Sequence, residues 1–246
     1  MLEFFDIRGL PEPFALFSFG HLLSLFLIFS AIVFLFWYRE RLKEERINRL
    51  TRYGLAGLLL ISDLVLNIWF IQAGSWTLDY NLPLQLCTIS LYLSAFMLIT
   101  RSVLLFEFAF LVGMGGALQA LLTPDLGHYS YPHFRTYQFF IAHGAIMLAG
   151  FYMVFVEGFR PTLHSIWRSI LLLNIIAALV GLANWLTGGN YMFLAHKPGA
   201  ASLLDLLGPW PYYIIWLEAV VLVSVLIFYL PFGLQDLWRK RTGRGN

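Results

Sequence analysis

The residues best suited to chemistry in this sequence are its single cysteine, Cys87, and one histidine, His143. An imidazole can take the proton of a thiol, and the resulting thiolate attacks acyl carbonyls. Such chemistry also needs a group that orients the imidazole and donors for the developing oxyanion. Cys87 lies in the stretch NLPLQLCTIS, residues 81–90, where polar groups open an otherwise apolar helix. A membrane helix gains nothing from polar groups there, so their presence suggests a site.

Several other polar residues fall at a similar depth in apolar segments. Four lie roughly 8–10 Å below the outer ends of their predicted helices, at 1.5 Å per residue: His21, Asn67, Cys87 and His143. Three more lie nearer the same surface: Gln85, Gln119 and Asn184. Asp63 is one turn deeper than Asn67 on the same helix face. Their shared depth favours a common site in which these residues bind substrate or orient the histidine.

Each of these residues also has a purely structural interpretation. Asn, Gln and His hold membrane helices together through hydrogen bonds, and a free cysteine often packs as a small hydrophobic residue. His21, His143 and Asp63 are a donor set that would suit zinc or iron. No local ligand motif accompanies them, so we predict neither a metal nor another cofactor.

Composition places the chain in a membrane. Of its 246 residues 59% are hydrophobic and only 12% are charged, whereas soluble domains have about 25% charged residues. The apolar runs of about 20 residues match the thickness of a bilayer and predict helices, because barrels show alternating segments of about 10 residues. The net charge of +2 indicates no nucleic-acid partner. The acidic N-terminal stretch lacks the basic region of a cleaved signal peptide.

The hydropathy pattern predicts an all-α polytopic membrane protein, a single transmembrane domain over residues 1–246. The seven predicted helices cover approximately residues 14–38, 54–73, 82–100, 103–122, 137–156, 166–186 and 212–230. If the loop RERLKEERINRLTR is cytoplasmic, all but three of the 16 Lys and Arg residues fall on that side. This bias predicts an outer N-terminus and a cytoplasmic C-terminus, in a cell membrane that we expect to be the bacterial cytoplasmic membrane.

Three stretches resemble one family of membrane proteins. LPLQLCTIS at residues 82–90, YQFFIAHGAIML at 137–148 and GGNYMFLAHKPGAASLLDLLGPWPYYI at 188–214 are similar to the bacterial YwaF-type integral membrane proteins. Gln85 stands where that family usually has a histidine. These proteins resemble the transmembrane protein 164 family, described as cysteine-dependent phospholipid acyltransferases. The resemblance implies that Cys87 is the nucleophile and His143 its partner.

A more distant resemblance links the chain to the androgen-induced-gene type of transmembrane hydrolases, which cleave fatty esters with a threonine and a histidine. Thr88 follows Cys87, but its side chain points about 100° away around the helix. We therefore favour the thiol.

The long segment before the last helix offers three further candidates, Asn190, Tyr191 and Asp205, which we expect to close over the site and position a substrate. Aromatic residues there would equally suit anchoring at the headgroup layer. The leading hypothesis is a lipid acyltransferase or acyl-ester hydrolase acting on a membrane phospholipid or fatty acyl ester. The alternative is a carrier or binding protein for a small amphipathic molecule that uses the same polar layer.

Overall fold

The structure is a computed structural model that describes residues 3–197 and 208–242. Within these ranges every regular element is helical, which confirms the predicted all-α class. The α-helices are α1 (Phe19–Trp37), α2 (Arg39–Leu42), α3 (Glu45–Gln72), α4 (Leu86–Thr100), α5 (Val103–Phe108), α6 (Met114–Leu122), α7 (Phe134–Phe155), α8 (Leu163–Thr187) and α9 (Tyr212–Arg241). Two short 3₁₀ turns, η1 (Glu3–Phe5) and η3 (Tyr191–Phe193), and one π-helical turn, η2 (Ala109–Gly113), complete the described elements.

Six helical segments of the described chain are long and apolar enough to cross a membrane. They are α1, α3, the continuous stretch Val103–Leu122, α7, α8 and α9. The remaining apolar helix, α4, has 15 residues and is therefore about 22 Å long, shorter than the roughly 30 Å hydrocarbon layer. The protein is thus a multi-pass membrane protein, although the predicted count of seven spans and the predicted orientation are not confirmed.

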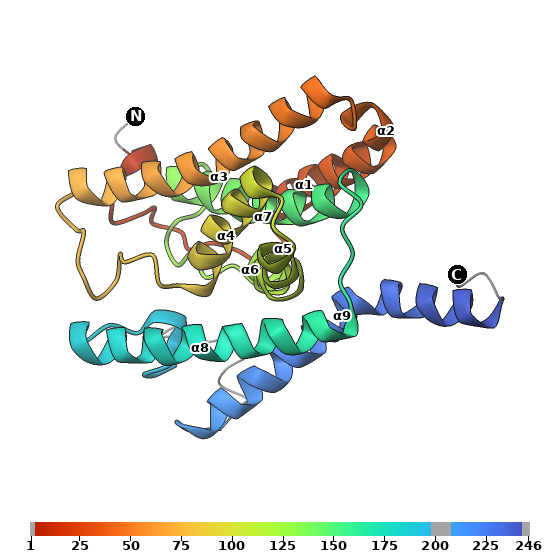
Figure 1. Ribbon diagram of the computed structural model, residues 1–246. Coiled ribbons are helices and arrows are strands. Elements are labelled where there is room, and N and C mark those ends of the chain that lie inside the picture. Colours follow the sequence, from red (N-terminus) through yellow and green to blue (C-terminus); the bar gives the residue numbers. More distant parts are fainter. Residues whose placement is uncertain (1–2, 198–207, 243–246) are drawn as a thin grey trace.

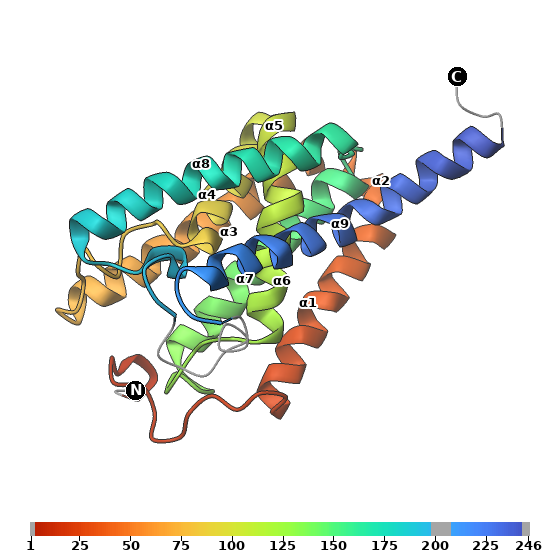
Figure 2. The same ribbon diagram turned by 90° about the horizontal axis from the view of Figure 1, so that it is seen from below.

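The helices pack in layers around α7. In Figure 1, α8 and α9 lie together below α4 to α7, with α3 on the opposite side. Figure 2 shows α9 extending beyond the other helices toward the C-terminus. Most of α7 is buried, whereas α1, α8 and α9 expose most of their apolar side chains. Those exposed faces are expected for helices that meet lipid instead of water.

Small residues allow the close packing of α7. At Gly144, an added Cβ would lie 2.9 Å from a side-chain carbon of Ile28 on α1. At Gly150, it would lie 2.1 Å from the sulfur of Met114 at the start of α6. Each glycine therefore fixes the approach of a neighbouring helix, as small residues commonly do in membrane proteins.

Several helix ends differ from the predicted ones. The predicted helix 54–73 in fact begins at Glu45, because most of the charged segment before it is helical. The predicted helix 82–100 begins only at Leu86, after a turn that contains Pro83. The last helix continues beyond Leu230 to Arg241 and includes Pro231 in its interior. Charge and proline thus mark the limits of the apolar stretches here, but not the ends of the helices.

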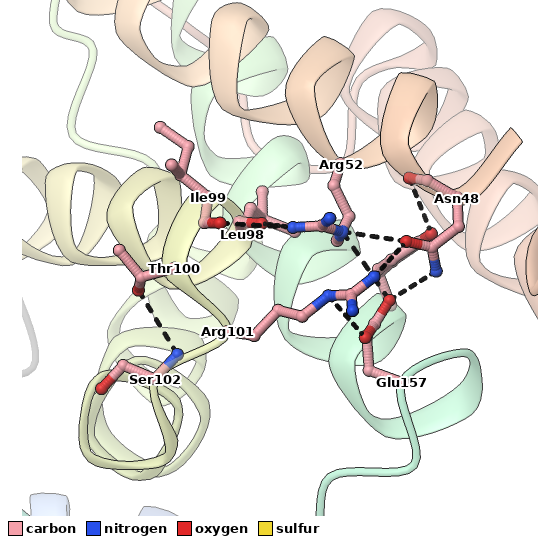
Figure 3. A network of polar contacts seen from close by, with 9 residues as sticks. Asn48, Arg52, Leu98, Ile99, Thr100, Arg101, Ser102 and Glu157 are labelled. Carbon is pink, nitrogen blue, oxygen red and sulfur yellow. Dashed lines mark hydrogen bonds and ion pairs between the residues drawn. The ribbon is translucent and has the colours of Figure 1, made fainter. Parts of the chain in front are cut away.

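A charged network closes one end of the bundle, which we call the basic end (Figure 3). Arg52 of α3 donates to the carbonyl oxygens of Leu98 and Ile99 in the last turn of α4. Its Nε donates to Asn48 at 2.9 Å and lies 3.8 Å from a carboxylate oxygen of Glu157. The side chains of Arg52 and Glu157 are each only 8% exposed. The network therefore neutralises buried charge and satisfies the free carbonyls at the end of α4.

Arg101 joins this network from the turn between α4 and α5. It is the C-cap residue of α4 and has a left-handed backbone, with φ of 56°. Its Nη2 donates to Asn48 at 2.7 Å, and its Nε lies 3.1 Å from Glu157. The stretch TRS thus forms a tight turn between α4 and α5, and its arginine also forms an ion pair with Glu157, just beyond the end of α7.

We predict that Glu157→Gln lowers the free energy of unfolding by about 3 kcal/mol, because it leaves the buried guanidinium of Arg52 without a counter-ion. The thermal midpoint of purified protein in detergent, followed by intrinsic fluorescence, would measure the effect. Glu44→Gln is the matched control, since Glu44 is exposed and its side chain makes no capping hydrogen bond. An unchanged midpoint for Glu157→Gln would show that the network contributes no net stability.

Candidate functional site

Gln85 ties the segment before α4 to the segment before α9. It occupies the N-cap position of α4, but its side chain makes no capping hydrogen bond. Its Oε1 instead accepts a hydrogen bond from the backbone N–H of Met192 at 2.9 Å. Met192 and Phe193 both have positive φ angles, 56° and 53°. The glutamine of the QLC stretch thus holds an unusual backbone turn in place above the start of α4.

Tyr191 is completely buried and makes a second link between the same two segments. Its hydroxyl donates to the carbonyl oxygen of Leu78 at 2.8 Å and accepts from the N–H of Leu82 at 2.9 Å. Burial raises the pKa of Tyr191, so the hydroxyl remains a proton donor at neutral pH. Residues 78–85 are therefore held by the segment that follows α8.

Asn184 and Asn190 fix the shape of this anchoring segment. Asn184, at the end of α8, exchanges two hydrogen bonds with the backbone of Tyr191, at 2.8 and 3.0 Å. Asn190 accepts from the N–H groups of Ala195 and His196, both at 3.0 Å. The side chains of both residues bind backbone groups of the segment itself. Asp205, the other candidate in this region, lies outside the described residues.

Cys87 lies in the first turn of α4, directly below this anchored segment. Within the described chain, the backbone N–H groups of Leu86, Cys87 and Thr88 have no hydrogen-bond partner. Free N–H groups at a helix start favour a nearby negative charge. The position therefore offers donors to an oxyanion.

The side chain of Cys87 faces α6. A Cβ added at Gly116 would lie 4.0 Å from the Cys87 sulfur and 3.5 Å from a methyl carbon of Leu86. Leu86 and Gly116 also line a cavity of about 50 Å³ that continues to α9. The other lining residues are Leu111, Val112, Gly115, Gln119, Val220, Val221 and Ser224. The cavity is mostly apolar, and among the predicted site residues it contains Gln119.

His143 is buried in α7, and one of its ring nitrogens forms a hydrogen bond. Its Nδ1 lies 2.8 Å from the carbonyl oxygen of Phe139, so Nδ1 carries the proton and donates it. Nε2 then has a free lone pair, and no described residue forms a hydrogen bond with it. His143 lies seven residues before Gly150, on the same helix face, and Gly150 packs against Met114 of α6.

No hydrogen bond joins Cys87 and His143 in the described part of the chain. The structure therefore shows no direct contact between the two members of the predicted pair. Catalytic hydrogen bonds are often long in the absence of substrate and tighten when it binds.

His21 lies apart from this arrangement. Its Nδ1 accepts from the N–H of Phe17 at 3.0 Å, and its Nε2 lies 2.9 Å from the carbonyl oxygen of Leu121. Both nitrogens are thus occupied by backbone groups, and the ring links the start of α1 to the end of α6. This completely buried histidine has no nitrogen left for a substrate.

Asp63 and Asn67 form a second polar cluster between α3 and α4. One carboxylate oxygen of Asp63 accepts from Asn67 at 3.1 Å and from the hydroxyl of Tyr92 at 2.7 Å. The amide oxygen of Asn67 accepts from the indole of Trp76 at 3.0 Å. Sequence reasoning missed Tyr92 and Trp76, because aromatic residues are frequent throughout the chain and nothing in their spacing distinguishes these two. No contact within the described chain connects this cluster to Cys87.

The described residues contain no group of three or more His, Cys, Asp or Glu side chains that could hold a metal ion. The predicted site residues instead form separate groups around α4: the anchoring segment at its start, Cys87 with the cavity toward α6 and α9, and the Asp63 cluster toward α3.

Comparison with known proteins identifies the family. The model of the TMEM164 family matches residues 16–229, which include α1 to α8 and the first part of α9. The chain belongs to the TMEM164 family. No curated protein and no solved structure gives a significant match. The expected relation to transmembrane protein 164 is confirmed, and the resemblance to YwaF-type proteins stays a prediction.

For this TMEM164 family member we predict that Tyr191→Phe loosens residues 78–85, since it removes both hydrogen bonds of the hydroxyl. The loss should cost about 1–3 kcal/mol and make this segment more sensitive to limited proteolysis, read by mass spectrometry of the fragments. Tyr80→Phe is the control, because Tyr80 is exposed and its hydroxyl makes no hydrogen bond in the described chain. Equal cleavage rates in the two variants would contradict the anchoring role of Tyr191.

Proposed function

We propose that this TMEM164 family protein transfers or hydrolyses a fatty acyl group of a membrane lipid, with Cys87 as nucleophile and His143 as general base. The observation that carries the proposal is the placement of Cys87: it lies in an uncapped first helical turn and beside a mostly apolar cavity. The cavity of about 50 Å³ has room for the first carbons of an acyl chain, next to the place where its carbonyl carbon would meet the thiol. The family membership makes lipid acyl chemistry the natural class.

In the first proposed step, Nε2 of His143 takes the thiol proton and the sulfur attacks the acyl carbonyl carbon. The backbone N–H groups of Cys87 and Thr88 are the available donors to the oxyanion. The carbon–oxygen ester bond then breaks, the leaving alkoxide takes the proton from His143, and the acyl group remains on Cys87 as a thioester.

In the second proposed step, an acceptor hydroxyl or a water molecule loses its proton to His143 and attacks the thioester. The carbon–sulfur bond breaks and the thiolate recovers the proton, which returns the enzyme to its starting state. Because Sγ and Nε2 are not hydrogen-bonded without substrate, the first proton transfer requires a bridging water or a small movement of α4 or α7.

We predict that an activated fatty thioester acylates the protein at Cys87. The chain has one cysteine, so hydroxylamine-sensitive label can be assigned without peptide mapping. Cys87→Ser should abolish this label, and His143→Ala should slow its formation by about 10²–10⁴-fold. Thr88→Val is the control and should react at the normal rate. Full lipid-acyl turnover by well-folded Cys87→Ser would refute the nucleophile, and absence of labelling and turnover with every lipid ester would favour the carrier hypothesis.

We further predict that filling the cavity selects against long acyl chains. Gly116→Leu should reduce the rate of acylation by a long-chain thioester at least about 10-fold, since its side chain would occupy the space next to Leu86. Acylation by an acetyl thioester should change little. Gly181→Leu on α8 is the matched control, because nothing lies near an added Cβ there. If both chain lengths react as in the wild type, the acyl chain lies elsewhere.

A further inference from the structure

Arg135, the second residue of α7, is a partly buried cation that has no ion-pair partner among the described residues. It belongs to none of the ion pairs formed by the described residues. Its Nη1 donates to Oε1 of Gln138 at 2.6 Å, and no other side-chain hydrogen bond of Arg135 occurs in the described chain. A guanidinium has five N–H donors. Most of its capacity to bind an anion is therefore unused.

The nearby carboxylates do not supply the missing partner. Asp63 and Asp125 interact electrostatically with Arg135, but neither forms an ion pair with it. One oxygen of Asp63 is already bound by Asn67 and Tyr92. A cation near a membrane interior without a counter-ion is costly, and such residues commonly mark binding sites. An external anion would compensate the charge.

Arg135, Phe139 and His143 form a column on one face of α7. They are spaced four residues apart, so their side chains lie one above another. The guanidinium carbon of Arg135 is 5.5 Å from the centre of the Phe139 ring. The Phe139 and His143 rings are 4.1 Å apart between centroids, and the Phe139 carbonyl accepts the Nδ1 hydrogen of His143. A charged group, an apolar ring and the proposed base thus follow in order along the helix.

We propose that Arg135 binds the phosphate of a glycerophospholipid whose acyl ester lies beside His143. The inference rests on the proposed function and adds to it the residue that recognises the headgroup. The guanidinium leans over Phe139, about one helical turn of 5.4 Å from the level of His143. In a glycerophospholipid only the glycerol carbons separate the phosphate from the nearest acyl ester, a comparable span. A guanidinium also matches the oxygen pair of a phosphate with two parallel hydrogen bonds.

The test measures binding without turnover. Two ether-linked lipids with identical chains, a dialkyl phosphatidylglycerol and a dialkylglycerol, cannot be cleaved, so failure of the proposed reaction would not affect the result. Titration into detergent-solubilised protein should show that Arg135→Gln weakens binding of the phospholipid by about 10- to 100-fold. Binding of the dialkylglycerol should not change. Arg8→Gln is the matched control, because Arg8 is exposed and already paired with Asp6.

Arg135→Lys provides a second variant if the glutamine variant does not keep the wild-type melting profile. It retains the charge but loses the paired geometry, and we expect about 10-fold weaker binding of the phospholipid. Equal losses for both lipids, or no loss for either, would overturn the proposal. Displacement of the phospholipid by inorganic phosphate at equal concentration would identify a site for a free anion and would overturn the assignment to a lipid headgroup.

Discussion

The requirement that every backbone polar group in a membrane protein finds a partner governs the environment of α4. With 15 residues, this helix is too short to carry its ends into water on both sides of a hydrocarbon layer of about 30 Å. The protein supplies partners from elsewhere in the chain. Arg52 binds the last carbonyls of α4, and Gln85 and Tyr191 hold the segment at its start. Cys87 owes its position to these supports at both ends.

The backbone polar groups at the two ends of α4 find partners to different extents. At the basic end, charged side chains satisfy the carbonyl groups almost completely. At the other end, the N-cap residue turns its side chain away to bind Met192, and the first N–H groups have no partner among the described residues. Leaving backbone groups unpaired is unfavourable unless a ligand completes them. This asymmetry supports a role for the start of α4, and the free Nε2 of His143 adds to it.

The helical class and most long segments follow from hydropathy, because bilayer thickness dictates the length of apolar runs. The functional roles of single polar residues were harder to predict. Depth along a helix can be counted from the sequence, but the direction of a side chain depends on packing that the sequence does not display. His21 and His143 were predicted at equal depth, yet the ring of His21 is saturated by backbone groups while His143 keeps one nitrogen free.

Contacts between distant segments were beyond reach for the same reason. The hydrogen bond from Met192 to Gln85 joins residues 107 positions apart, and no local sequence pattern predicts it. Arg135 counted in the sequence only as one of the few basic residues on the predicted outer side. Its significance depends on the absence of an ion-pair partner, which requires knowledge of all its neighbours.

The π turn Ala109–Gly113 determines the directions in which the side chains of α6 point. A π turn accommodates one residue more than an α-helix of the same course, and one residue corresponds to about 100° of rotation. At its end Gly113 meets Ser90, and Gly116 meets Cys87, one turn nearer the start of α4. If the same residues formed a regular α-helix, those beyond this point would be rotated by about 100°, and Gly116 would no longer face the thiol. The π turn therefore sets the rotation of α6 that keeps Gly116 opposite Cys87.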